Sequence, residues 1–166
     1  MIQDIYPHQL NNHYDPGVQA KKEDTLLCIV NGRILVEETC FEENELRFPR
    51  VKDLADEYVA DIRYLFAIDD SRYFLCDHLL EQKDIPEGYA YVDEKSLRKE
   101  GIGPDEALFA AVTGKHLADW YRDTKFCGSC GHEMQHSKTE RAMVCPACHY
   151  TAYPRIMPAV IVGVTN

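Results

Sequence analysis

Four of the seven cysteines form two C-x2-C pairs, Cys127 with Cys130 and Cys145 with Cys148, with 14 residues between the pairs. Glycine and proline stand inside or beside both pairs, so each can turn tightly and direct two sulfurs at one ion. Four thiolates in this pattern bind zinc tetrahedrally, with Zn–S distances of about 2.3 Å. Four protein ligands leave no open position for a reacting water. The spacing therefore predicts one structural zinc per chain.

Iron is the alternative metal, because rubredoxin sites also use paired C-x2-C turns, and such a protein would transfer electrons. We favour zinc, since the segment Ala142-Met143-Val144 predicts a short strand that leads into the second pair, as in a zinc ribbon. Three histidines lie nearby and are interpreted as exposed side chains, because four cysteines already complete a ligand set. They are His132, His136 and His149.

The other three cysteines, Cys28, Cys40 and Cys76, are far apart in the sequence. Isolated cysteines in apolar, strand-like segments are usually small buried hydrophobic residues. The N-terminus has neither the basic start nor the apolar stretch of a signal peptide. We therefore expect a cytoplasmic protein with free thiols and metal ligands, not disulfides.

Composition limits the classes of function. The 166 residues are 45% hydrophobic and 28% charged, which is typical of a soluble globular protein with a core. No stretch approaches the roughly 18 apolar residues of a membrane-spanning helix. A net charge of -10 disfavours non-specific binding to nucleic acid. Residues 1–114 contain 12 Lys and Arg and 24 Asp and Glu, whereas residues 115–166 contain 6 Lys and Arg and 4 Asp and Glu. This change in the sign of the net charge predicts two structural units.

Local patterns predict a mostly antiparallel sheet followed by a helix. Residues 25–37 contain two β-rich runs around Asn31-Gly32, the strongest hairpin signal in the chain. A second hairpin is expected over residues 63–77, with a four-residue turn at 69–72, and another strand over residues 88–93. A helix should begin with Pro104 at its first position and end near Asp123, with Gly114 as a weak point where it kinks or a neighbouring backbone approaches closely. The segment up to about residue 22 is expected to be a loose arm.

Five segments from residue 108 onward form an ordered combination of motifs: Leu108-Phe109, residues 116–121, residues 125–131, Lys138-Thr139-Glu140 and residues 153–158. This combination, more than the cysteines alone, resembles the bacterial NADH pyrophosphatases, the NudC-type family of Nudix hydrolases. The first hundred residues fit only as loosely as that family's variable N-terminal domain would.

The resemblance implies an α+β fold in three parts. Residues 1–123 would form an N-terminal domain that ends in a helix, residues 124–156 a zinc ribbon, and residues 157–166 the first strand of a truncated Nudix domain. The family's catalytic box, G-x5-E-x7-R-E-x2-E-E-x-G, binds Mg or Mn, but these 166 residues contain no Arg-Glu dipeptide. We therefore expect a fragment without catalytic residues that is inactive alone.

The resemblance also implies substrate and partners. The family hydrolyses NADH or NAD to nicotinamide mononucleotide and AMP, removes NAD caps from RNA, and forms homodimers. Glu140 and Tyr153 match its substrate-contacting Glu and Tyr. Without the resemblance, Glu140 is a solvated charge and Tyr153 packs beside the metal. The alternative function is a stand-alone zinc-ribbon module that binds protein or nucleic acid, although residues 115–166 lack a basic and aromatic stripe.

Overall fold

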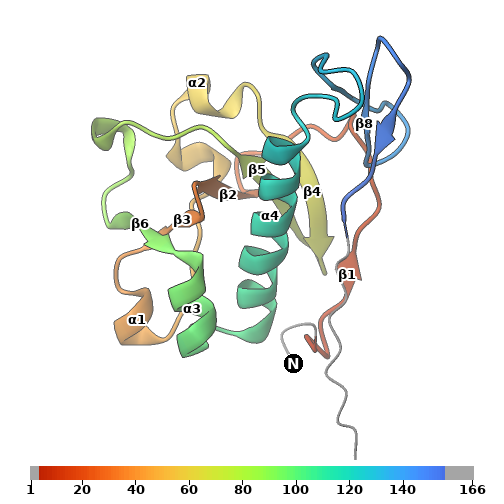
Figure 1. Ribbon diagram of the computed structural model, residues 1–166. Coiled ribbons are helices and arrows are strands. Elements are labelled where there is room, and N and C mark those ends of the chain that lie inside the picture. The colour runs from red at the N-terminus through yellow and green to blue at the C-terminus, as the bar shows by residue number, and fades with distance from the viewer. Residues whose placement is uncertain (1–3, 156–166) are drawn as a thin grey trace, which may run out of the picture.

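A computed structural model describes residues 4–155, and the predicted strand at 157–166 lies outside this range. The N-terminal part is built on a six-stranded sheet with the strand order β1-β4-β5-β2-β3-β6 (Figure 1). Its strands are β1 (Leu10–Asn11), β2 (Thr25–Val30), β3 (Arg33–Glu37), β4 (Arg63–Ile68), β5 (Ser71–Cys76) and β6 (Tyr89–Asp93). The α+β class predicted from the sequence is confirmed.

Both predicted hairpins are present. Strands β2 and β3 pair antiparallel around Asn31 and Gly32, whose φ angles are 52° and 78°. The turn between β4 and β5 is shorter than predicted, because Ser71 pairs with Ile68 and only two residues remain outside the ladder. The two hairpins meet at β2 and β5, which run parallel. The sheet is therefore mostly antiparallel with one parallel pair at its centre.

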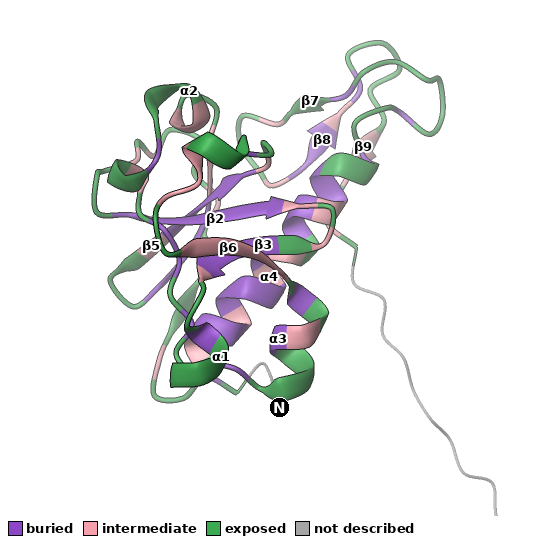
Figure 2. Ribbon diagram, turned by 90° about the vertical axis from the view of Figure 1, so that its left-hand side faces the viewer, coloured by how far each residue is buried: buried purple, intermediate pink, exposed green. Residues whose placement is uncertain are grey.

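The central strands are buried on both faces, which explains why β2 has an unbroken apolar sequence. Leu27 and Ile29 belong to the large core beneath the long helix, whereas Leu26 and Cys28 belong to a second core on the opposite face. That face is covered by the segment containing the 3-10 helix η1 (Val51–Asp53) and α2 (Asp56–Val59). Figure 2 shows buried residues along β2 and β3 and down the length of α4.

The long helix α4 (Asp105–Asp123) packs across the sheet beside α3 (Glu94–Glu100) (Figure 1). It starts one residue later than predicted, because Pro104 has an extended ψ of 150° and stands at the N-cap instead of inside the first turn. The helix continues through Gly114. A Cβ atom at this position would lie 2.4 Å from Cδ1 of Leu27, so a strand side chain, not a backbone, approaches there.

The N-terminal arm is more ordered than the sequence predicted. Strand β1 pairs antiparallel with β4, and the backbone N–H of Gln9 donates to Oδ1 of Asp69 at 2.9 Å. Three further short helices, α1 (Cys40–Glu43), α3 and η2 (Gln82–Asp84), were also not predicted. All three scattered cysteines are buried, as expected.

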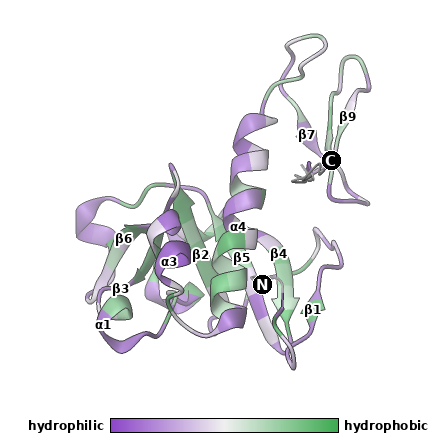
Figure 3. Ribbon diagram, turned by 60° about the horizontal axis from the view of Figure 1, so that its bottom comes forward, coloured by the Kyte–Doolittle hydropathy of each residue, from purple (hydrophilic) through white to green (hydrophobic). Residues whose placement is uncertain are grey.

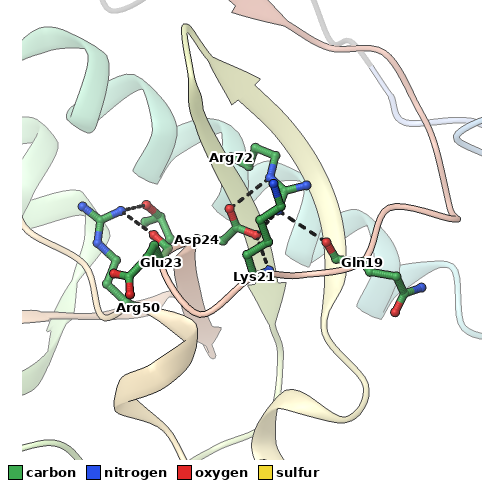
Figure 4. Close-up of polar contacts among 7 residues, drawn as sticks. Gln19, Lys21, Glu23, Asp24, Arg50 and Arg72 are labelled. Carbon is green, nitrogen blue, oxygen red and sulfur yellow. Dashed lines mark hydrogen bonds and ion pairs between the residues drawn. The ribbon is translucent and has the colours of Figure 1, made fainter.

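A polar cluster around Asp24 fixes the chain entering β2 (Figure 4). The Asp24 carboxylate accepts from the backbone N–H of Lys21 at 2.6 Å and from Nε of Arg72, in β5, at 3.0 Å. Nη1 of Arg50 donates to the Glu23 carbonyl at 3.4 Å. Because a nearly buried carboxylate needs such partners, the cluster ties the entry of β2 to the neighbouring strand.

Beyond α4 the chain forms a second, three-stranded sheet of β7 (Gln135–His136), β8 (Met143–Val144) and β9 (Thr151–Ala152). The strand predicted at residues 142–144 is thus confirmed as β8. Figure 3 shows α4 extending from the larger sheet to this small unit. Within residues 4–155, no helix is both long and apolar enough to cross a membrane.

Candidate metal centre

The two cysteine pairs come together at one point of the small unit. The Sγ atoms of Cys127, Cys130, Cys145 and Cys148 all lie within 4.8 Å of one another. Three of the separations are 3.6 Å for Cys127–Cys148, 3.4 Å for Cys130–Cys145 and 3.3 Å for Cys130–Cys148. A tetrahedral zinc with Zn–S bonds of about 2.3 Å needs sulfurs about 3.8 Å apart. The four thiols therefore lie close to the arrangement that a tetrahedral zinc requires.

The two pairs form matching turns. In the first, the N–H of Cys127 donates to the His132 carbonyl at 2.8 Å, and in the second the N–H of Cys145 donates to the Tyr150 carbonyl at 2.8 Å. The backbone becomes left-handed after each pair, at Gly131 with φ 77° and at His149 with φ 60°. Such turns aim backbone N–H groups at the sulfurs, as the N–H of Ser129 donates to Sγ of Cys127 at 3.4 Å.

The electrostatics of the four thiols also favour a cation. Backbone N–H groups of Cys148 and Ala147 lower the pKa of Cys145 to about 6. The pKa of Cys130 is raised to about 12 by the neighbouring thiols of Cys148 and Cys145, against the opposite effect of the His132 backbone. Crowded thiols cannot all ionise unless positive charge compensates them, and a bound divalent ion supplies that charge. The arrangement supports a structural zinc.

The histidines near the pairs do not join this cluster. Among the described residues, the group able to hold a metal consists of the four cysteines alone. His136 lies on β7, where its ring is 5.2 Å from that of Tyr121. Burial lowers the pKa of His136, and the charge of Arg63 lowers it further. His136 is exposed, as are His132 and His149, which confirms the prediction from the sequence, and its ring also contacts Tyr121 of α4.

Glu140 and Tyr153, the two predicted substrate contacts, are neighbours. The Tyr153 hydroxyl donates to Oε1 of Glu140 at 3.1 Å, and Tyr153 is 53% exposed. This hydrogen bond to a carboxylate raises the pKa of Tyr153. Both residues are exposed, and the Tyr153 hydroxyl is directed at the Glu140 carboxylate. The pair presents one carboxylate and one aromatic ring on an open surface.

A cavity of about 540 Å³ lies where β2, α4 and the small unit meet, and sequence reasoning missed it. Its cationic side chains Arg63, Arg122 and Lys125 are matched in number by the carboxylates Asp77, Asp119 and Glu133, and two ion pairs form, Arg63–Asp77 and Arg122–Asp119, each at 2.8 Å. The last turns of α4 line it, and the negative end of a helix disfavours an anion. Neither Glu140 nor Tyr153 is among its lining residues. The cavity therefore offers no charge complementarity to a phosphate.

Sequence reasoning also missed Tyr14 and Arg141. Tyr14 stands in the N-terminal arm and donates to the Ser137 carbonyl in the small unit. Arg141 reaches in the other direction, to the Leu65 carbonyl in β4. These contacts join residues 123 and 76 positions apart, respectively, so no local pattern could have indicated them.

Comparison with known proteins agrees with this geometry. Residues 122–153 match the family model described as the NADH pyrophosphatase zinc ribbon domain. Proteins named NAD-capped RNA hydrolase NudC from Salmonella paratyphi B, Salmonella newport and Salmonella heidelberg are each 48% identical to this chain over 67 residues. The match covers 40% of this chain and 26% of each relative. The chain therefore spans about a quarter of the length of the curated relatives it matches.

The fold and the cysteine cluster define a zinc-ribbon protein, in which a long helix connects the ribbon to an α+β domain. Within that class, the ribbon is similar to that of the NADH pyrophosphatases, and the chain is similar to the NudC-type hydrolases over the 67 matched residues.

Proposed function

We propose that the chain acts as the N-terminal domain and zinc ribbon of an NAD(H) pyrophosphatase. Such an enzyme cleaves the pyrophosphate of NADH or NAD to nicotinamide mononucleotide and AMP, and also acts on NAD-capped RNA. The observation that carries the proposal is the contact between Glu140 and Tyr153, two exposed residues inside the segment that matches the NADH pyrophosphatase ribbon. Their proximity supports a shared role at the substrate.

In this proposal each member of the pair has its own role. The Tyr153 ring, more than half exposed, stacks on or hydrogen-bonds to the nucleotide. The Glu140 carboxylate accepts hydrogen bonds from the substrate, because an ionised carboxylate offers only acceptors. The cysteine-bound zinc has no position for substrate and keeps the ribbon folded. We further propose that the protein is cytoplasmic and forms a homodimer in which the pair reaches the partner's nucleotide site.

The chemical step is not carried out by the residues of this chain. The glutamates that hold Mg or Mn in the Nudix box have no counterpart in these 166 residues. On this proposal, residues 1–123, 124–156 and 157–166 form the N-terminal domain, the ribbon and the start of the catalytic domain. The chain alone should not hydrolyse NADH, with or without added Mg.

A fusion tests the proposal. Residues 1–158 are joined to the Nudix domain of one of the Salmonella relatives, and NADH hydrolysis is measured in the presence of Mg. We expect hydrolysis by the fusion, a lower kcat/KM for its Tyr153→Ala variant, and unchanged zinc content in both. Tyr150→Ala is the matched control, since Tyr150 is another exposed ribbon tyrosine.

Two results would contradict the proposal. One is a folded, zinc-loaded fusion that does not hydrolyse NADH. The other is an equal kcat/KM for the Tyr153→Ala and Tyr150→Ala variants, because Tyr153 would then have no special relation to the substrate. In either case, a zinc-ribbon module that binds protein or nucleic acid becomes the function to test.

A further inference from the structure

Glu140 stands on an exposed ribbon loop, residues 137–141, which connects β7 to β8. The loop is partly held from within, because Oγ of Ser137 accepts from the backbone N–H groups of Thr139 and Glu140, each at 3.3 Å. Hydrogen bonds to an exposed hydroxyl contribute little against water. The backbone N–H of Ser137 also donates to the Ala142 carbonyl at 2.9 Å, and that of Ala142 donates to the Glu140 carbonyl at 2.8 Å. These bonds close the loop on itself, but none of them ties it to the N-terminal domain.

The first end of the loop is anchored by the N-terminal arm. The Tyr14 hydroxyl donates to the Ser137 carbonyl at 2.8 Å. Tyr14 is half-buried, and burial raises its pKa, so the hydroxyl stays protonated and remains a donor. The start of the loop is thereby fixed to a segment more than a hundred residues away in the sequence.

The second end is anchored by the central sheet. Nη2 of Arg141 donates to the Leu65 carbonyl, and Leu65 is fully buried in β4. The same guanidinium lies over the Tyr14 ring, 5.6 Å from its centroid. Arg141 is therefore held by a charged hydrogen bond and by a cation–π contact, both of which strengthen as water is excluded. Tyr14 takes part in both anchors, and the two anchored residues, Ser137 and Arg141, stand on either side of Glu140.

We propose that Tyr14 and Arg141 are positioning residues, which hold the ribbon loop so that Glu140 stays in hydrogen-bond contact with Tyr153. The inference rests on the proposed function, in which this pair contacts the substrate. A preorganised pair binds a ligand without the entropy cost of ordering a mobile loop. The N-terminal domain thus contributes to the nucleotide site through the loop it restrains, although it supplies neither residue of the pair.

The experiment uses the zinc-loaded chain and the pKa of Tyr153 as its main readout. The carboxylate of Glu140 raises this pKa only while the two side chains are in contact. Tyr14→Phe removes one anchor's hydroxyl but keeps the ring, and Arg141→Ala removes the other anchor. Tyr14 and Arg141 make their hydrogen bonds to Ser137 and Leu65, not to Tyr153, whose hydroxyl contacts Glu140. Lys138→Ala, at an exposed position of the same loop, is the matched control.

We expect the Tyr153 pKa to fall toward its ordinary value in Arg141→Ala. It should fall further in the double variant, which combines Tyr14→Phe with Arg141→Ala, and the zinc content should stay unchanged in both. Lys138→Ala should keep the wild-type pKa, and Arg141→Lys should recover part of the shift. Purely global destabilisation would not move this pKa in the folded protein. An unchanged Tyr153 pKa in the double variant overturns the inference.

NADH binding separates this inference from the proposed function. In the fusion described above, the double variant should bind NADH about tenfold more weakly, because the pair is no longer preorganised. If the pKa of Tyr153 falls as expected but wild type and double variant bind NADH with equal affinity, the anchors position the pair and the pair does not contact substrate. That outcome contradicts the proposed function and the substrate role of the anchors, but not the restraint itself.

Discussion

The Tyr153 hydroxyl and the Glu140 carboxylate are 3.1 Å apart, although the two residues are 13 positions apart in the sequence. Glu140 precedes β8 and Tyr153 follows β9, and the antiparallel pairing of these strands brings the two positions together. The contact gives the exposed ribbon surface a defined polar feature. The contact also raises the pKa of Tyr153, and this shift can be measured without substrate.

Replacing Glu140 should change the ionisation of Tyr153. The Glu140→Gln variant removes the negative charge that opposes deprotonation of the phenol, so the Tyr153 pKa should fall toward the ordinary value of 10.0. An NMR titration of the labelled tyrosine ring measures this shift. Glu133→Gln, at another exposed ribbon carboxylate, is the control and should leave the titration unchanged. A Tyr153 pKa that is identical in wild type and Glu140→Gln would show that the contact does not persist in solution.

Removing one thiol should remove the metal. Cys127→Ser and Cys148→Ser each leave three thiolates, and in such small units the free energy of metal binding is largely the free energy of folding. We expect both variants to lose zinc and the dispersed NMR signals of residues 124–155. Cys40→Ala is the control, because Cys40 is buried in α1, outside the metal cluster. One zinc per chain in either serine variant, measured by metal analysis, would refute the ligand set.

The parts of the fold that could be predicted depend on neighbours in the sequence. Asn31 and Gly32 specify the first hairpin because both must adopt positive φ, and the C-x2-C spacing specifies the metal turns by itself. The helix α3 was missed because its seven residues show little periodicity. Its ends were nevertheless marked, since Asp93 accepts from the N–H of Lys95 and Gly101 takes a left-handed conformation.

The remaining features depend on contacts between distant residues. The parallel pairing of Cys28 with Cys76 places the two hairpins side by side, and neither hairpin sequence contains a signal for it. Glu140 and Tyr153 were each identified only through resemblance to a known family, and nothing in the sequence indicated that the two side chains touch. The anchors from Tyr14 and Arg141 had no signal of either kind, because a tyrosine in an irregular arm and an arginine in a loop are ordinary surface residues.

Adding a methyl group at Gly114 should destabilise the protein. The new Cβ would meet Cδ1 of Leu27 at 2.4 Å and Cδ1 of Ile29 at 3.3 Å, in a core where Leu27 is fully buried. Overpacking typically costs about 1–3 kcal/mol, and alanine recovers about 1 kcal/mol in helix propensity. We expect Gly114→Ala to lose about 1 kcal/mol in chemical unfolding. Thr113→Ala improves propensity without adding volume and should not lose stability; a Gly114→Ala variant more stable than wild type would contradict the close approach.

The contact between His8 and Asp69 should make docking of the N-terminal arm depend on pH. Nδ1 of His8 lies 2.7 Å from Oδ2 of Asp69, and this hydrogen bond raises the pKa of His8 above 6.5 and lowers that of Asp69 below 3.8. The stabilisation that protonated His8 gives to the docked arm is complete below pH 6.5 and is lost as the pH rises through its raised pKa. That of Asp69 is complete above pH 3.8 and is lost as the pH falls through its lowered pKa. The arm should therefore be held best between these two limits.

An NMR titration of the His8 ring tests this prediction and ranks its causes. Asp69→Asn should bring the His8 pKa down toward 6.5, because the hydrogen bond that His8 donates to the Asp69 carboxylate is the largest cause of the shift. Glu106→Gln should lower it by less, since Glu106 acts through charge alone from 3.6 Å. Asp70→Asn, next to Asp69 in the turn, should have little effect. If Asp69→Asn leaves the titration where it was, the arm is held by the pairing of β1 with β4 and not by this ion pair.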